Sequence, residues 1–158
     1  MITDNGTKQY WLLKSEPDVF SIDDLERDGT TPWEGVRNYL ARNYMMAMQP
    51  GDLAIFYHSS TTPPGAAGVM EVATTAAPDK QQFDTTSDYF DEKATLTTPR
   101  WFCVEFKFVQ KFAKIVTLDE MKKNKKLKDM VVLRRGNRLS ITPLTKSEFE
   151  AVEQAASP

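Results

Sequence analysis

The sequence predicts a single α+β domain, in which a partly closed, mixed β-barrel carries short helices at its rim. Its 158 residues are most simply one domain and are enough to bury a substantial core. Short apolar runs typical of strands are mixed irregularly with short helical patterns, unlike the regular alternation of a doubly wound sheet. The sequence contains no apolar run of the roughly 20 residues that span a bilayer.

One strand and two helices are predicted for the first third of the chain. Tyr10–Lys14 has the apolar composition of a strand. A helix is expected to begin after Ser21, because the serine hydroxyl can accept a hydrogen bond from a free amide of the first turn. Asn38–Met48 is expected to be the second helix. Its predicted apolar face consists of residues four apart, namely Leu40, Tyr44 and Met48.

Three further strands surround a long polar segment. Leu53–Tyr57 is almost wholly apolar, which is typical of a central strand that is buried on both faces. Val69–Ala73 is predicted to be the next strand. Pro78–Arg100 is polar and weakly periodic, and loops of that length in a compact domain are often functional. A strand with one buried face is then predicted by alternating apolar residues, namely Phe102, Val104, Phe106 and Phe108.

The C-terminal part is predicted to contain a short helix, a strand and a final helix. Thr117 begins a capping box that opens the short helix. Leu139–Ile141 is the expected closing strand. Thr145 begins a second capping box, in which Leu144 and Phe149 can form a hydrophobic staple.

Composition and charge exclude several kinds of site. The net charge of −2 argues against a protein that coats nucleic acid through bulk charge, although it leaves room for a local basic site. Cys103 is the single cysteine and His58 the single histidine, so neither an intrachain disulfide nor a Cys/His zinc site can form. We therefore expect no metal and no cofactor. The first residues lack the pattern of a secretory signal. We expect an intracellular chain, cytoplasmic if bacterial and nuclear if eukaryotic.

Trp33–Tyr44 carries the clearest functional signal in the chain. It combines aromatic rings, guanidinium groups and side-chain amides in one short segment. Together these groups can sandwich a flat ring, hydrogen-bond its edge and neutralise a phosphate. Proteins that hold an unstacked base need all three capacities. The alternative is a half-exposed helix with its aromatic residues in the core and its arginines in water.

A series of short motifs runs in order across nearly the whole chain: Tyr10–Pro17, Trp33–Tyr39, Ala41–Asn43, Gly51–Asp52, Tyr57–Ser59, Pro99–Trp101 and Arg138–Ser140. In this order the motifs resemble the EVE domain family. The resemblance implies a PUA-like fold related to YTH and ASCH domains. It implies a single domain over residues 1–158, with its core at about 8–154. It also implies recognition of modified bases in nucleic acid.

The candidates for contact with a base are Trp33, Tyr39 and Trp101 for stacking, and Ser15, Glu16, Asn38, His58 and Ser59 for hydrogen bonds to its edge. Asn38 offers both a donor and an acceptor, but it could instead cap the helix that follows. Glu16 could accept a hydrogen bond from a ring nitrogen or an exocyclic amine, or it could fix its own loop through a salt bridge or cap. His58 and Ser59 point to opposite faces of a strand, which makes a catalytic pair awkward. Trp11 is a reserve stacking face, although its place on a first strand favours the core.

Guanidinium groups bind phosphate in a bidentate manner, so arginines are the natural contacts for flanking phosphates. The predicted phosphate contacts are Lys14, Arg37, Arg42, Arg100 and Arg138, with Arg134 and Arg135 as further candidates. The lysine run at 122–128 is either a basic patch or a solvated helix face.

We therefore expect a monomeric, non-enzymatic reader that binds a modified base in nucleic acid, most simply DNA, through an aromatic pocket with basic flanks. A hydrolase acting on nucleic acid or nucleotides is the first alternative and would use Glu16, Asp52 and His58. The sequence lacks the phosphate-loop, zinc-deaminase and nucleophile-elbow motifs that would support it. A protein-interaction module that uses the 78–100 loop is the second alternative. None of the three involves a membrane.

Overall fold

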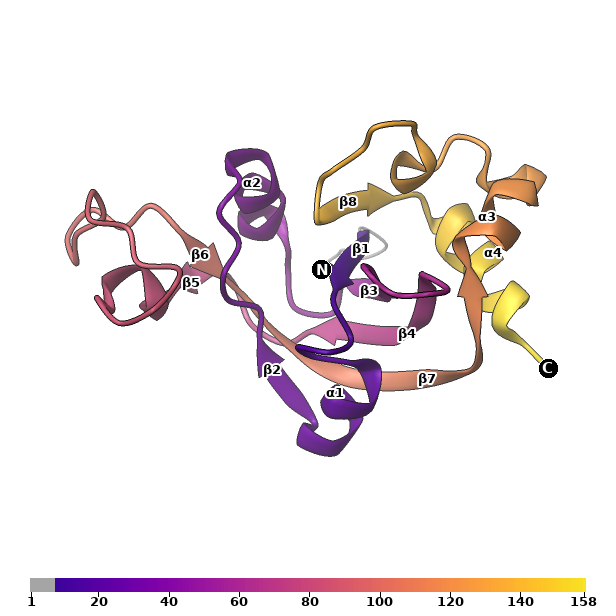
Figure 1. Ribbon diagram of the computed structural model, residues 1–158, viewed down its shortest axis with the longest axis horizontal. Helices are drawn as coiled ribbons and strands as arrows, with labels where there is room; N and C mark the ends of the chain where they lie inside the picture. Colours follow the sequence, from indigo (N-terminus) through magenta and orange to yellow (C-terminus); the bar gives the residue numbers. More distant parts are fainter. Residues whose placement is uncertain (1–7) are drawn as a thin grey trace, which may run out of the picture.

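The computed structural model describes residues 8–158 and is built around a six-stranded mixed sheet with the order β2-β7-β4-β3-β1-β8. β1 (Tyr10–Ser15) and β3 (Leu53–His58) pair in parallel, and the other neighbouring strands of this sheet are antiparallel. The sheet curls into half of a barrel with short helices around it (Figure 1). The predicted fold class is thereby confirmed.

The remaining strands of the main sheet are β2 (Thr30–Pro32), β4 (Gly65–Val72), β7 (Glu105–Thr117) and β8 (Ile141–Leu144). A separate two-stranded sheet consists of β5 (Ala77–Pro78) and β6 (Phe102–Cys103). The single strand predicted over 102–109 is therefore wrong in its limits, because β6 pairs with β5 while β7 starts afresh and continues to Thr117. The predicted closing strand at 139–141 lies instead at 141–144.

β7 bends along its length (Figure 1) while it pairs antiparallel with β4, and two glycines of β4 allow the backbones to approach closely. A Cβ atom on Gly65 would lie 2.3 Å from the carbonyl oxygen of Val116. A Cβ atom on Gly68 would lie 2.3 Å from that of Gln110. The pairing of the two strands shifts register in this region. Because glycine is depleted in strands, the sequence pattern placed the start of β4 at Val69 instead of Gly65.

Four helices surround the sheet: α1 (Ile22–Asp28), α2 (Tyr39–Ala47), α3 (Leu118–Lys123) and α4 (Lys146–Ala156). Three short 3-10 turns are η1 (Lys80–Phe83), η2 (Lys125–Leu127) and η3 (Val131–Leu133). The three predicted caps are confirmed, since Ser21, Thr117 and Thr145 each accept a hydrogen bond in a capping box. Within residues 8–158, none of the helices is long and apolar enough to cross a membrane.

The apolar face predicted for α2 is wrong at one of its three residues. Met48 is fully buried and Tyr44 packs against the same core, as predicted. Leu40 is 46% exposed, and Ala41 and Met45 are the fully buried residues within the helix. The spacing of four residues therefore identified the helix but included Leu40 in place of the small Ala41.

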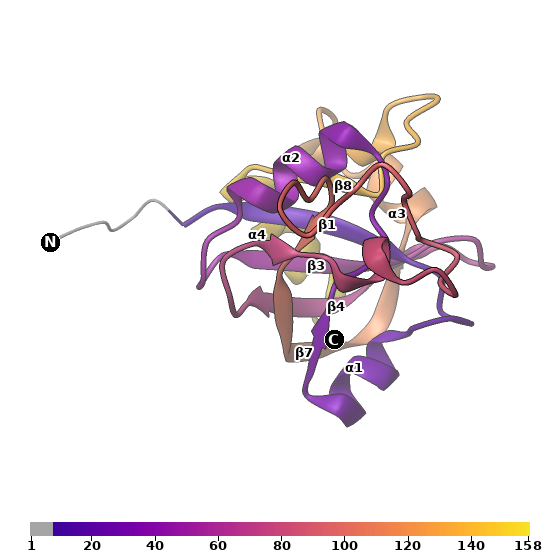
Figure 2. The ribbon, with the colours of Figure 1, turned by 90° about the vertical axis from the view of Figure 1, so that its left-hand side faces the viewer.

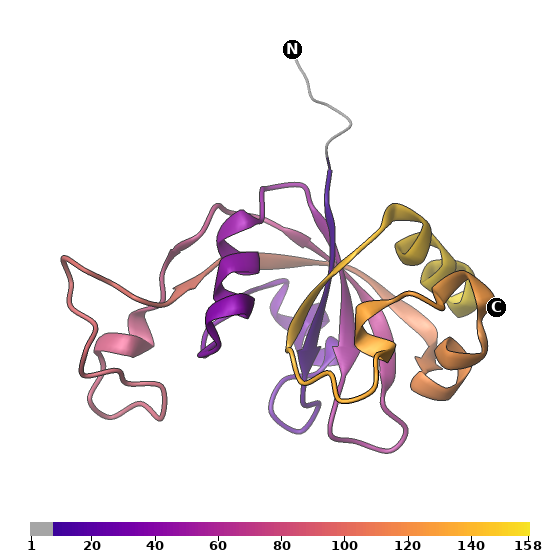
Figure 3. The same cartoon turned by 90° about the horizontal axis from the view of Figure 1, so that it is seen from above.

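The sheet is buried on both faces, because alternate side chains of its central strands enter two different cores. Trp11 and Leu13 of β1 join the core that includes residues of α1 and α2. Leu12 joins the core that includes residues of α3 and α4. Figure 3 shows α2 on one side of β1, and α3 and α4 on the other. The segment that joins β5 to β6 extends away from α3 and α4 (Figures 1 and 3) and faces the viewer in Figure 2.

Candidate functional site

A pocket of about 470 Å³ opens where β1 ends, and we call it the Trp33 pocket. It is lined by Lys14–Glu16, Val19–Phe20, Thr31–Glu34, Gln81 and Tyr89. Three separate stretches of the chain thus meet there: the end of β1 with the following turn, β2 with its extension, and the loop between β5 and β6. The volume lies in the range of pockets that hold small ligands.

Trp33 forms an aromatic wall of this pocket, and contacts with the core fix the position of its ring. Its ring is half-buried and packs edge-to-face against Phe56 and Phe106, with ring centroids 5.6 and 5.5 Å away. Its backbone N–H donates to the carbonyl oxygen of Val104 at 2.9 Å, which continues the pairing of β2 with β7. A side chain fixed in this way can accept a stacked ring without losing much further conformational entropy.

The turn after β1 supplies polar groups at the pocket's edge. The Ser15 hydroxyl donates to the carbonyl oxygen of Phe20 at 2.5 Å. The Glu16 carbonyl oxygen accepts from the amides of Val19 and Phe20, both at 2.9 Å, so the Glu16 side chain remains exposed. Burial lowers the pKa of the Lys14 ammonium, the one cationic group that lines the pocket. Ser15 and Glu16 therefore lie where the sequence predicted them, beside Trp33.

A chain of hydrogen bonds connects Glu34 to the loop. The Tyr89 amide donates to the Ser87 hydroxyl oxygen at 3.0 Å, and that hydroxyl donates to Gln81 Oε1 at 2.7 Å. Gln81 Nε2 then donates to Glu34 Oε1 at 3.0 Å. The second carboxylate oxygen of Glu34 has no hydrogen-bond partner in residues 8–158. The predicted site residues did not include Glu34, Gln81 or Tyr89, although Glu34 follows Trp33 in the Trp33–Tyr39 motif.

Asp79 anchors the loop to the segment that follows Trp33. Its carboxylate is fully buried and accepts from the Gly35 amide at 2.8 Å, Arg37 Nη1 at 3.0 Å and the Gln81 amide at 2.8 Å. Arg37 also donates through Nε and Nη2 to the carbonyl oxygen of Tyr89. The guanidinium of Arg37 thus holds the loop, and its predicted role as a phosphate contact stays a prediction.

Tyr39 and Trp101, two predicted stacking residues, stack on each other outside the pocket. Their ring centroids are 4.9 Å apart and their planes are inclined by 25°. Trp101 is buried and donates through Nε1 to Asp91 at 2.8 Å. The guanidinium groups of Arg42 and Arg100 lie over the Tyr39 ring at 4.8 and 5.7 Å from its centroid. Tyr39 and Trp101 therefore lie outside the Trp33 pocket, and their role in base stacking stays a prediction.

Arg42 and Arg100 belong to the same internal cluster. Arg42 Nη1 donates to the carbonyl oxygen of Arg100 at 3.0 Å. Arg100 donates to the Tyr39 hydroxyl and lies 3.6 Å from a carboxylate oxygen of Asp91. Both arginines thus contribute to local structure, and their predicted contact with phosphate stays a prediction.

Asn38, His58 and Ser59 also lie outside the lining of the Trp33 pocket. Asn38 caps α2 by accepting from the Ala41 amide at 3.0 Å, which is the alternative that its position allowed. His58 Nε2 accepts from the Ile22 amide at 3.2 Å at the start of α1. Burial is the main cause that lowers the pKa of His58. Ser59 donates its amide to the carbonyl oxygen of Ser15 at 2.9 Å and so supports the end of β1.

The three residues proposed for a hydrolase do not form one site. Asp52 is buried and accepts from the Trp11 indole at 3.1 Å and from two backbone amides, so it is a structural carboxylate. It precedes β3, whereas His58 ends it, and a strand of that length separates the two groups by roughly 20 Å. Trp11 is confirmed in the core. Burial and three nearby carboxylates raise the pKa of the Cys103 thiol to about 12, which leaves it protonated and a poor nucleophile.

Arg138 remains available for a ligand. It is exposed and makes no side-chain hydrogen bond or ion pair within residues 8–158. The Ser140 carbonyl oxygen accepts from the Lys14 amide at 2.9 Å, which places this segment beside the end of β1 and thus beside the pocket. Arg134 and Arg135 are exposed on the same segment. The lysines at 122–128 are all exposed, on α3 and η2.

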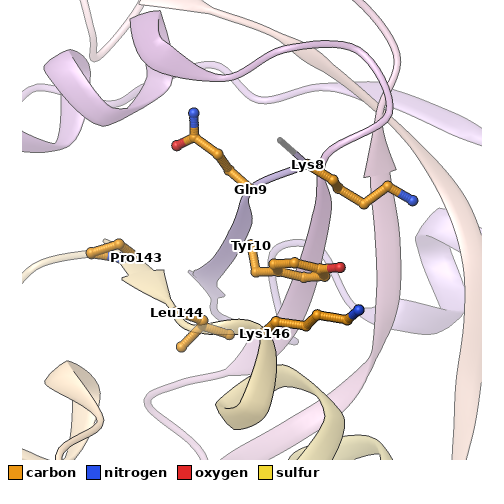
Figure 4. A pocket seen from close by; sticks show the side chains of 6 residues that line it. All are labelled: Lys8, Gln9, Tyr10, Pro143, Leu144 and Lys146. Atoms are coloured by element: carbon orange, nitrogen blue, oxygen red, sulfur yellow. The ribbon is translucent and has the colours of Figure 1, made fainter. Parts of the chain in front are cut away.

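A second pocket, of about 500 Å³, lies at the opposite end of β1, and we call it the Tyr10 pocket. Its lining consists of Lys8–Tyr10, Pro143–Leu144 and Lys146. Figure 4 shows the polar tips of Lys8, Tyr10 and Lys146 pointing the same way. The Tyr10 ring packs against Phe149 with centroids 5.0 Å apart. No carboxylate lines this pocket.

A curled mixed sheet with short peripheral helices and a pocket at the end of its first strand defines a PUA-like domain. The model of the EVE domain family matches residues 9–155, and the chain belongs to this family. Thymocyte nuclear protein 1 of Homo sapiens is 40% identical over 162 residues, which cover 90% of this chain and 72% of that protein.

Solved structures support the same assignment. A hypothetical protein from Leishmania major is 46% identical with a TM-score of 0.90, covering 94% of both chains. Human THYN1 in complex with 5-methylcytosine-containing DNA is 38% identical with a TM-score of 0.89, covering 96% of this chain and 99% of that one. A YTH domain of Zygosaccharomyces rouxii is 10% identical with a TM-score of 0.59, which shows a shared fold alone.

Proposed function

We propose that this protein is a non-enzymatic reader that binds DNA carrying a modified base, with that base turned out of the helix into the Trp33 pocket. The observation that carries the proposal is the meeting of Trp33, Ser15 and Glu16 in one pocket. The human relative in complex with 5-methylcytosine-containing DNA supports both the DNA and the class of modification.

The chemistry of the pocket favours a neutral ring over a phosphate. Its lining contains two carboxylates, Glu16 and Glu34, and one ammonium, Lys14. A phosphate would be repelled by the two carboxylates, whereas a base can stack on Trp33 and hydrogen-bond along its edge. Stacking is worth roughly 1–3 kcal/mol per base, comparable to the few kcal/mol needed to turn a base out of a duplex.

Phosphates of the DNA backbone would then lie outside the pocket. Arg138, with Arg134 and Arg135 on the same exposed segment, is the basic group best placed to meet them, because this segment borders Lys14. Contacts of this kind position the DNA and make binding salt-dependent without reading its sequence.

The proposal is tested by titrating duplexes that differ only in one central cytosine, which is unmodified in one and 5-methylated in the other, followed by fluorescence anisotropy. Burial of one methyl group is worth about 1 kcal/mol, so we expect the methylated duplex to bind about fivefold more tightly. N6-methyladenine in a third duplex separates a cytosine reader from a broader one. Equal dissociation constants for every duplex at low salt, or no binding, would refute the proposal.

The loop predicted as a protein contact contributes Gln81 and Tyr89 to the Trp33 pocket. Its anchoring through Asp79 supports a part in the same site rather than a separate docking surface.

A further inference from the structure

We infer that Glu34 selects bases that carry an exocyclic amino group, by accepting a hydrogen bond from that amine. The inference rests on the proposed function and assigns the choice between base edges to one residue. It separates two parts of recognition: Trp33 would hold any planar ring, whereas Glu34 would accept only some of the edges.

The position of Glu34 supports this role. Glu34 lines the same pocket as Trp33, so a ring stacked on the indole would lie in a cavity that Glu34 also borders. One oxygen of the Glu34 carboxylate is held by Gln81 Nε2 at 3.0 Å. The other oxygen is without a hydrogen-bond partner in the part of the chain that the structure describes, and it is therefore available to a donor on a ligand.

The hydrogen-bond chain behind Glu34 fixes its orientation. Because the Ser87 hydroxyl donates to Gln81 Oε1, the Gln81 amide must present its nitrogen to Glu34. The Tyr89 amide in turn orients the Ser87 hydroxyl oxygen. A carboxylate held in one orientation discriminates better than a mobile one, because a mismatched ligand cannot be accommodated by rotation of the side chain. Gln81 is thus a positioning residue for Glu34.

Charge determines which edges are accepted. A carboxylate can only accept hydrogen bonds, so it favours the amino group of cytosine or adenine and repels the O4 carbonyl oxygen of thymine or uracil. Lys14, on another side of the same pocket, can donate to a ring nitrogen or carbonyl oxygen, which the amino-bearing bases also present. The lining therefore matches an edge that combines a donor with an acceptor.

5-Methylcytosine and thymine provide a sharp test, because both carry the same methyl group. They differ at position 4, where one has an amine and the other a carbonyl oxygen, and at N3, which accepts a hydrogen bond in 5-methylcytosine and donates one in thymine. Each base is placed opposite an abasic site in the same duplex, so that the cost of unpairing is equal. We expect the unaltered protein to prefer 5-methylcytosine by roughly tenfold or more. In Glu34→Gln the side-chain amide can donate to O4, and the ratio of the two dissociation constants is expected to fall to about one.

Three further variants make the assignment specific. Gln81→Ala should lower the preference while keeping the affinity for thymine. Glu92→Gln, which neutralises an exposed carboxylate of the same loop outside the pocket, should leave the preference unchanged. Thermal melts confirm that each variant is folded. A preference that survives Glu34→Gln, or one that is lost in Glu16→Gln instead, would overturn the inference. Failure of the unaltered protein to distinguish methylated from unmodified cytosine would instead count against the proposed function.

Discussion

The two pockets at the ends of β1 are similar in size, about 470 and 500 Å³, yet their linings differ in kind. The Trp33 pocket combines an aromatic wall, two carboxylates and one ammonium. The side chains of Ser15, Glu34 and Gln81 in its lining are held by hydrogen bonds from three stretches of the chain. The Tyr10 pocket contains two lysines and no carboxylate. Volume therefore does not distinguish the two pockets, whereas the chemistry of their linings does.

The largest effect is expected when the loop between β5 and β6 is detached from the Trp33 pocket. Asp79→Ala removes a buried carboxylate that holds two amides and the Arg37 guanidinium. Because these donors lose their partner, we expect the free energy of unfolding to fall by about 3 kcal/mol, measured by urea denaturation. Asp88→Ala, on the same loop but exposed and without a side-chain hydrogen bond within residues 8–158, should change it by less than about 0.5 kcal/mol. A small effect of Asp79→Ala would show that the loop is held by other contacts.

A second test removes the aromatic ring from each pocket in turn. Trp33→Ala is expected to weaken binding of the methylated duplex by about 5- to 150-fold, because a stacking surface worth roughly 1–3 kcal/mol is lost. Tyr10→Ala destabilises the fold by removing the contact with Phe149, but should leave the preference for the methylated duplex unchanged. Anisotropy titrations below the melting temperature of each variant compare the two. Equal losses would mean that the Tyr10 pocket also takes part in recognition.

The smallest expected effect concerns His58, which supports the Trp33 pocket indirectly by anchoring α1. Burial, with a smaller effect of Lys111, lowers its pKa below the ordinary 6.5, while Asp23 opposes the shift. The stabilising effect of the neutral ring is therefore complete above the unfolded-state pKa and is lost as the pH falls through the folded-state pKa.

We expect the unfolding midpoint to fall slightly more between about pH 8 and pH 5 in the unaltered protein than in His58→Gln. The glutamine oxygen can still accept the Ile22 amide but does not titrate in this range. Parallel pH profiles of the two proteins would contradict the assignment.

Much of the fold was predictable because it depends on local patterns. The apolar runs of β1 and β3 and the caps at Ser21, Thr117 and Thr145 each depend on residues a few positions apart. The course of β7 was not predictable in the same way, because its bend depends on the close approach to β4.

The site was only partly predictable for a related reason. Residue types indicated what each side chain could do, and Trp33, Ser15, Glu16 and Lys14 do meet in one pocket. The sequence did not reveal that other candidates already have partners, as Arg37 has in Asp79. Gln81 and Tyr89 reach the pocket because tertiary contacts set the path of their loop. No local sequence pattern predicts this position for them.

Gly35 has a consequence for how this recognition surface can change over evolution. Its φ of 88° and the Tyr89 ring, which lies 2.9 Å from where a Cβ atom would be, together leave no room for a side chain. Any larger residue would push the Tyr89 side of the pocket away from the Trp33 side. New specificities in this family should therefore arise from substitutions in the loop between β5 and β6, while position 35 remains glycine. An alanine at position 35 should mark homologues in which the two sides of the pocket no longer enclose a ligand.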